Sequence, residues 1–174
     1  MAKGIASGMP LSACVAPSEM LDSSVASHLT TTGGNPVSCA AGLATLEVIE
    51  KEKLAENAAA VGSHMVRRLT EMKEAHPLIG DVRGEGLIIG VELVKDHKTK
   101  EPAPSETKKL VYRCWENGLI IIYLGTHSNV IEITPPLVLT KELAEDGLNK
   151  FEMSLADVEH GKVTDERLEA FRGW

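Results

Sequence analysis

A single lysine near the start of the chain, Lys3, stands among small residues in the stretch MAKGIASGMPLSA. Small residues let other groups approach the backbone closely, and glycine allows backbone angles that other residues avoid. A lysine amine in such a setting could reach a buried cofactor, where loss of water makes it a nucleophile toward an aldehyde. Taken by itself, this stretch favours the plainer alternative, a solvated lysine at a frayed terminus.

A run of hydroxyl-bearing residues in TTTGGNP, which includes Thr31 and Thr32, precedes the first clear helical pattern. Hydroxyls and free N–H groups ahead of a helix N-terminus make an anion site. The alternative is an ordinary capping loop, because Asn35 is a good N-cap and Pro36 suits the first helical position. A capping loop explains Asn35, but it does not explain three consecutive threonines and two glycines.

The chain has three cysteines and six histidines, and neither set has the spacing of a metal site. We therefore expect no metal. The cysteines form no disulfide framework, which indicates a reducing, cytoplasmic setting. We also expect no secretory signal, and no apolar stretch approaches the roughly 20 residues that span a bilayer.

The composition is that of one globular domain, with 174 residues of which 43% are hydrophobic and 25% charged. Only 3% are aromatic, so the core must consist of aliphatic and alanine side chains. The net charge of −7 argues against nucleic acid or an anionic membrane as a partner.

Helical patterns dominate residues 36–76. An alanine-rich helix is expected to begin at Asn35–Pro36, and a second helix is expected to end before Pro77. Apolar residues follow spacings of three and four along the second helix, which predicts a core-facing stripe. The stripe consists of Leu54, Ala58, Val61, Met65, Leu69 and Met72.

After residue 76 the expected order is β-β-α-β-β-α, which predicts a small sheet covered by helices on one face. The apolar run LIIGVELV, residues 87–94, predicts a strand buried on both faces. Further strands are expected in LIIIYL and NVIEITPPL. Helices are expected in SETKKLVYRCWENG, in the segment capped by Thr140, and in TDERLEAFRGW.

Three separated stretches, AKGIASGMPLSA, TTTGGNPVSCAAGLATLEVIE and HPLIGDVRGEGLIIGVELVKD, together with NVIEITPPLVLT, closely resemble class III aminotransferases. These are pyridoxal 5'-phosphate (PLP) enzymes with the α/β fold of aspartate aminotransferase, fold type I. The resemblance implies that this chain is the C-terminal portion of that fold. It assigns residues 1–35 to the end of the large PLP-binding domain, 36–76 to connecting helices and 77–174 to a C-terminal α/β subdomain.

The resemblance also implies roles for the candidate residues. Lys3 aligns with the lysine that forms the Schiff base with PLP and carries a proton between substrate and cofactor. Thr31 aligns with the threonine that binds the cofactor phosphate of the neighbouring subunit, and Thr32 occupies a position that is usually aromatic. The family is dimeric, so we expect a homodimer with shared active sites that acts on small amino and keto acids.

Two departures from the family stand out. The phosphate loop, the aromatic that stacks on the ring and the aspartate paired with the pyridine nitrogen cannot be found here, so we expect a C-terminal part that is catalytically incomplete alone. The second departure is Glu132, at a position where the family usually has an arginine that binds the substrate carboxylate. Glu132 is either a new substrate determinant or a sign that the substrate lacks a carboxylate there. The alternative is a solvent-facing residue on an edge strand.

Three functions remain open. The first is a class III aminotransferase that moves an amino group from an ω-amino or amino acid donor to a keto acid. The second is a racemase of amino acids or amino-lactams with the same fold, which the ending AFRGW also resembles. The third is a non-catalytic C-terminal fragment. Arg83, in DVRGEG, is expected to be either a buried structural arginine at a tight turn or a substrate contact.

Overall fold

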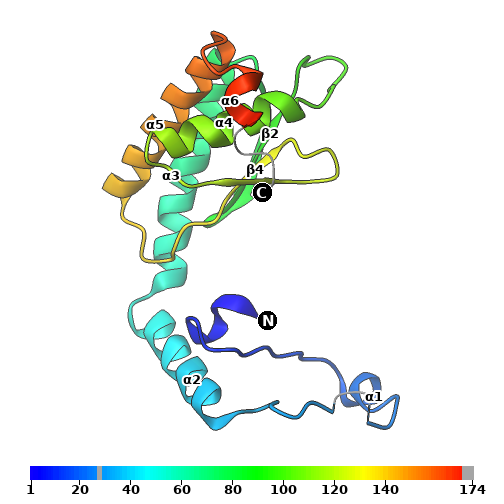
Figure 1. Ribbon diagram of the computed structural model, residues 1–174. Helices are drawn as coiled ribbons and strands as arrows, with labels where there is room; N and C mark the ends of the chain where they lie inside the picture. Colours follow the sequence, from blue (N-terminus) through cyan, green and yellow to red (C-terminus); the bar gives the residue numbers. More distant parts are fainter. Residues whose placement is uncertain (27–28, 170–174) are drawn as a thin grey trace. The chain divides into compact units, whose positions relative to one another are not determined.

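The computed structural model describes residues 1–26 and 29–169. The chain forms two compact units, Met1–Leu54 and Ala55–Trp174, and each has its own internal packing (Figure 1). The expected division of the complete fold at residues 35 and 76 stays a prediction. Within the described part of the chain, no helix combines the length and the apolar composition that crossing a membrane requires.

The first unit consists of loops and three helical segments, η1 (Lys3–Ala6), α1 (Ser18–Leu21) and α2 (Pro36–Lys51). The N-cap prediction for α2 is confirmed, because the Asn35 side chain accepts hydrogen bonds from the N–H groups of Val37 (3.0 Å) and Ser38 (3.3 Å). Pro36 stands at the first helical position, where its missing N–H leaves no bond unmade.

The second unit has the expected order of elements. They are α3 (Leu54–Ala75), β1 (Ile79–Glu85), β2 (Ile88–Leu93), α4 (Pro104–Glu116), β3 (Ile122–Leu124), β4 (Val130–Ile133), α5 (Lys141–Glu159) and α6 (Asp165–Glu169). The four strands pair antiparallel in the order β1-β2-β4-β3. Thr140 caps α5, since its hydroxyl accepts from the Leu143 N–H. The end of the segment predicted as a last helix, residues 170–174, lies outside the described residues.

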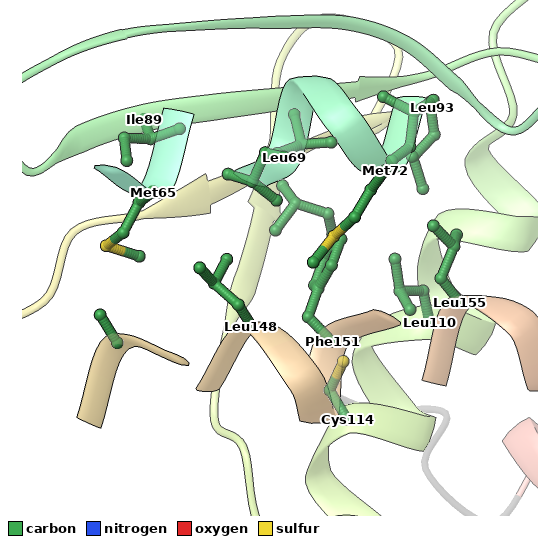
Figure 2. Packing of buried hydrophobic residues seen from close by; sticks show 14 of the residues in the cluster. Met65, Leu69, Met72, Ile89, Leu93, Leu110, Cys114, Leu148, Phe151 and Leu155 are labelled. Carbon is green, nitrogen blue, oxygen red and sulfur yellow. The ribbon is translucent and has the colours of Figure 1, made fainter. Parts of the chain in front are cut away.

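Three helices of this unit cover one face of the sheet. The predicted stripe of α3 is buried along its length, and its residues pack with the inward residues of β2. Figure 2 shows Met65, Leu69 and Met72 of α3 pointing toward Leu148 and Phe151 of α5. This arrangement confirms the expectation of a small sheet with helices on one face.

Two expectations about the sheet are wrong. Strand β2 is not buried on both faces: Ile89, Val91 and Leu93 are buried, whereas Ile88 is 71% exposed. The cause is the antiparallel pairing, which needs no helix on the second face. Strand β4, which carries Glu132, is not an edge strand, because it pairs with β2 on one side and β3 on the other.

Candidate functional site

Lys3 begins η1, a short 3-10 turn with left-handed backbone at both ends. The φ angle is +55° at Lys3 and +46° at Ser7, just after the turn. Residues with a Cβ adopt such angles only where their surroundings hold them. The Lys3 side chain is exposed. Within residues 1–26 and 29–169 its amine takes part in no ion pair, so it is available to a ligand.

The turn that carries Lys3 lies against the middle of α2 (Figure 1). Ala6 is buried there, and a Cβ added to Gly42 would lie 2.7 Å from the Leu11 side chain. The Ser7 and Thr45 hydroxyl oxygens are 3.1 Å apart, which joins the end of the turn to the helix. The Lys3 side chain is therefore exposed, while the turn that carries it is held in place by its contacts with α2.

Thr31 and Thr32 lie in an exposed turn that leads into α2. The Thr32 carbonyl accepts a hydrogen bond from the Asn35 N–H at 3.3 Å, and Gly34 adopts φ +70°, which glycine tolerates. Both threonines are exposed in this unit. They could bind an anion such as a phosphate.

The N-terminus of α2 adds no free donor to that anion site. The N–H groups of Val37 and Ser38 already bind the Asn35 side chain, and the Cys39 N–H binds the Asn35 carbonyl at 2.9 Å. The predicted anion site therefore depends on the threonine hydroxyls and the N–H groups of the loop.

Each of these residues suits one group of PLP, and the resemblance implies that Lys3 and Thr31 serve cofactors in different subunits. The Lys3 amine suits the aldehyde, and the hydroxyls of Thr31 and Thr32 suit the phosphate. The ring partners that the resemblance implies are not found in this sequence. The first unit contains the lysine and both threonines, and the second unit contains Glu132.

Glu132 lies on β4 between two neighbours in register, Gly90 of β2 and Ile122 of β3. It is half-buried and contributes to the lining of a cavity of about 420 Å³. The cavity is also lined by residues 119–122 and by the inward side of α5, so its walls are mostly aliphatic. Ile131, next to Glu132 on the strand, points into the core, so the Glu132 side chain lies on the opposite face of the sheet, where its carboxylate would disfavour a second carboxylate.

Arg83 is neither buried nor at the tip of the turn, so the first alternative, a buried structural arginine at a tight turn, is wrong. It lies within β1, and its guanidinium donates to Asp81 at 2.7 Å and to Glu92 at 2.8 Å. Hydrogen bonds to these two carboxylates raise the pKa of Arg83. We therefore assign it a structural ion pair on the exposed face of the sheet.

Sequence reasoning missed Thr45, which is bound to the turn that carries Lys3. A lone threonine inside an alanine-rich helix has no recognisable pattern. The available signal was Gly42, because a glycine inside a helix often marks a close approach of other backbone. Among the described residues, no group of three His, Cys, Asp or Glu side chains could hold a metal ion.

Comparison with known proteins gives a consistent family. The sequence model of "Aminotransferase class-III" matches residues 1–155. The chain is 48% identical to a leucine/methionine racemase of Thermococcus litoralis over 100% of its length and 39% of that protein. It is 52% identical to an alanine–glyoxylate aminotransferase 2 homolog of Arabidopsis thaliana over 83% of this chain and 31% of that protein.

Solved structures match as well. An (S)-enantioselective omega-transaminase from Thermomicrobium roseum superposes with a TM-score of 0.74 at 33% identity, over 90% of this chain and 36% of that one. The matching structures confirm the predicted fold, the C-terminal portion of PLP-dependent transferases. The chain spans between about a third and two fifths of the length of these relatives.

Proposed function

Because the chain belongs to the class III aminotransferase family, we propose that the protein carrying it is a PLP-dependent enzyme that acts on the α-carbon of an amino acid. The observation that supports this most is the turn of Lys3. It presents an amine without an ion-pair partner among the described residues, on a backbone held against α2. An amine that is accessible and held in place is what a carbonyl cofactor requires.

PLP, when bound, withdraws electrons from the substrate and so makes the proton on its α-carbon acidic. Lys3 would hold the cofactor through its amine, and its Nζ would take the proton from the substrate α-carbon and return a proton to it. Thr31 binds the cofactor phosphate through its hydroxyl. In the complete protein this threonine serves the site of the neighbouring subunit.

Racemisation of an amino acid is the reaction that we favour. A transaminase must bind a keto acid acceptor in addition to its amino donor, and Glu132 stands where the family places an arginine that binds a substrate carboxylate. A racemase returns the proton to the same carbon and needs no acceptor. The racemase relative also aligns with this chain over its whole length.

Transamination is the second candidate. It is supported by the aminotransferase relative, which has the higher identity over the shorter aligned part. The substrates would then be a small amino acid and a keto acid, with no change in the roles of Lys3 and Thr31.

A homodimer with shared active sites is part of this proposal. Apolar residues of α2 are exposed in the chain alone, with Val37 63%, Leu43 64% and Leu46 48% exposed. A helix face of this kind is covered in a stable soluble protein. Light scattering of the complete protein tests this, and a monomer with these residues accessible to solvent would contradict it.

The reaction is tested on the complete protein with PLP and a single L-amino acid in D₂O, without any keto acid. We expect deuterium at the α-carbon and formation of the D-enantiomer, with no keto acid product. Keto acid formed in proportion to the cofactor would instead identify a transaminase. Absence of α-deuteration with every amino acid tried would contradict both candidates.

The role of Lys3 is tested by borohydride reduction of the PLP-loaded protein followed by peptide mapping. The cofactor label is expected on Lys3 and is expected to disappear in Lys3→Ala. Lys53→Ala is the matched control, because Lys53 is also an exposed lysine with positive φ, +53°. A label on Lys53 or on any other lysine would overturn the assignment.

A further inference from the structure

Two hydroxyl groups and one carbonyl connect the turn of Lys3 to α2. Thr45 Oγ1 donates to the Ala41 carbonyl at 2.9 Å, which uses its only hydrogen. Ser7 Oγ lies 3.1 Å from Thr45 Oγ1 and is therefore the donor of that hydrogen bond. The result is a relay in one direction, from Ser7 to Thr45 to the Ala41 carbonyl.

The relay begins at Ser7, the residue that ends the turn in an energetically unfavourable left-handed conformation. Ser7 follows η1 with φ +46°, and its N–H donates to the Gly4 carbonyl at 3.1 Å, which closes the turn that Lys3 begins. A serine in left-handed conformation reverts to ordinary angles unless something holds it. The hydrogen bond to Thr45 stabilises this conformation, because Thr45 is half-buried on a helix and its hydroxyl is itself bound to the Ala41 carbonyl.

Packing alone does not hold the turn in this way. The contact at Gly42 is with the flexible end of the Leu11 side chain, and the Ile5 carbonyl lies 3.7 Å from the position that a Cβ would occupy. Ala6 is buried and contributes a single methyl group to the packing. These contacts fix the distance of the turn from α2, whereas a directed hydrogen bond fixes its orientation.

We propose that Thr45 is a positioning residue for Lys3, and that the hydroxyl relay through Ser7 sets the direction in which the Lys3 amine points. This inference rests on the proposed function, since it takes Lys3 as the amine that reacts with the cofactor. The effect is on the geometry of the nucleophile, which reactions of this kind depend on strongly.

The experiment uses the complete protein freed of cofactor, in the variants Thr45→Val, Thr45→Ser and Ser7→Ala. The rate at which added PLP and cyanoborohydride label Lys3 is measured by mass spectrometry, with the other lysines as internal references. Loss of one hydrogen bond of ordinary strength predicts labelling slower by about fivefold in Thr45→Val and Ser7→Ala. Thr45→Ser keeps the hydroxyl and is expected to restore the original rate.

Thr70→Val is the matched control, because Thr70 donates to the Val66 carbonyl at 2.7 Å in the same manner but is exposed on α3. It should leave Lys3 labelling unchanged. The double variant Ser7→Ala/Thr45→Val should label no more slowly than either single variant, since both remove one interaction. An unchanged rate in Thr45→Val, or a rate in Thr45→Ser as slow as in Thr45→Val, would overturn the relay.

Hydrogen exchange at the Ser7 amide tests, without the cofactor, whether Thr45 holds the turn that carries Lys3. The relay predicts faster exchange in Thr45→Val and Ser7→Ala and wild-type exchange in Thr45→Ser. If Lys3 is not labelled even in the wild-type protein, the proposed function fails. The exchange rates then still test whether Thr45 holds the turn, and equal rates in all variants would refute it.

Discussion

Arg83 and Glu132 lie on the same outward face of the sheet, two strands apart, with only Gly90 between them. Gly90 pairs in register with Arg83 on β1 and with Glu132 on β4. The guanidinium of Arg83 is bound to Asp81 and Glu92, so it does not neutralise Glu132. Among the described residues Glu132 has no ion-pair partner, and its charge therefore acts on whatever approaches this face.

The first prediction concerns this charge in the complete enzyme. Glu132→Arg replaces a repulsive group by one that can bind a carboxylate in a two-pronged ion pair. We expect the KM for a keto acid acceptor to fall by about tenfold, and transamination to increase relative to racemisation. Steady-state kinetics with and without keto acid measure both effects.

The control is Glu85→Arg. Glu85 is exposed on the same outward face, at the far end of β1. If both variants change the KM equally, the effect is one of net charge and Glu132 has no special place at the substrate.

The second prediction compares two glycines in the second unit. A Cβ at Gly62 would overlap the Gly86 carbonyl, where α3 crosses the β1–β2 turn, whereas a Cβ at Gly90 would have its nearest neighbour at 3.5 Å. Gly62→Ala should lower the free energy of unfolding of the chain by at least about 3 kcal/mol. Gly90→Ala should change it by no more than about 1 kcal/mol. Urea unfolding of both variants measures this, and similar values would contradict the described crossing.

Much of the second unit could be predicted from the sequence because its signals are local. The stripe of α3 and the Thr140 cap are fixed by helix periodicity and by an end group, and both are present in the structure. The error at β2 arose because an apolar run looks the same in a strand buried on two faces and in one buried on one. Ile88 is exposed because no helix among the described elements of the second unit covers the outward face.

The site was less predictable, because its contacts join distant parts of the chain. The role expected for Lys3 came from the resemblance, and its own neighbours favoured a solvated residue. The relay through Thr45 depends on how η1 docks on α2, which no local pattern reports. The same is true of Arg83, whose ion pairs follow from the register between β1 and β2.

The third prediction concerns thiol reactivity. Cys114 is completely buried on α4, and burial raises its pKa to about 11. At pH 8 the thiolate fraction is then about one in a thousand, so Cys114 should resist Ellman's reagent while the exposed Cys14 reacts. In denaturant all three cysteines should react. Rapid reaction of Cys114 in the native chain would show that the core between α4 and α5 opens readily.

The fourth prediction concerns Asp157, which joins α5 to α4. It is 6% exposed, and its carboxylate accepts hydrogen bonds from Lys162 (2.7 Å) and from Arg113 Nε (2.8 Å). These bonds, first that of Lys162 and then that of Arg113, lower the pKa of Asp157. Asp157→Asn should therefore lower the free energy of unfolding at pH 7 by about 2 kcal/mol.

The dependence on pH separates this charge effect from a packing effect. Because the pKa of Asp157 is lower in the folded chain, its stabilisation is complete above the unfolded-state pKa, about 3.9, and is lost as pH falls through the folded-state pKa. The difference in free energy of unfolding between wild type and Asp157→Asn should thus shrink below about pH 4.

Asp146→Asn is the control, since Asp146 is 60% exposed and pairs with Lys150 on the same helix at 2.7 Å. This substitution should lower the free energy of unfolding by less than about 0.5 kcal/mol. Urea unfolding from pH 7 to pH 2.5 measures both variants. If the loss in free energy of unfolding caused by Asp157→Asn stays constant over this range, Asp157 stabilises the fold through packing rather than through its charge.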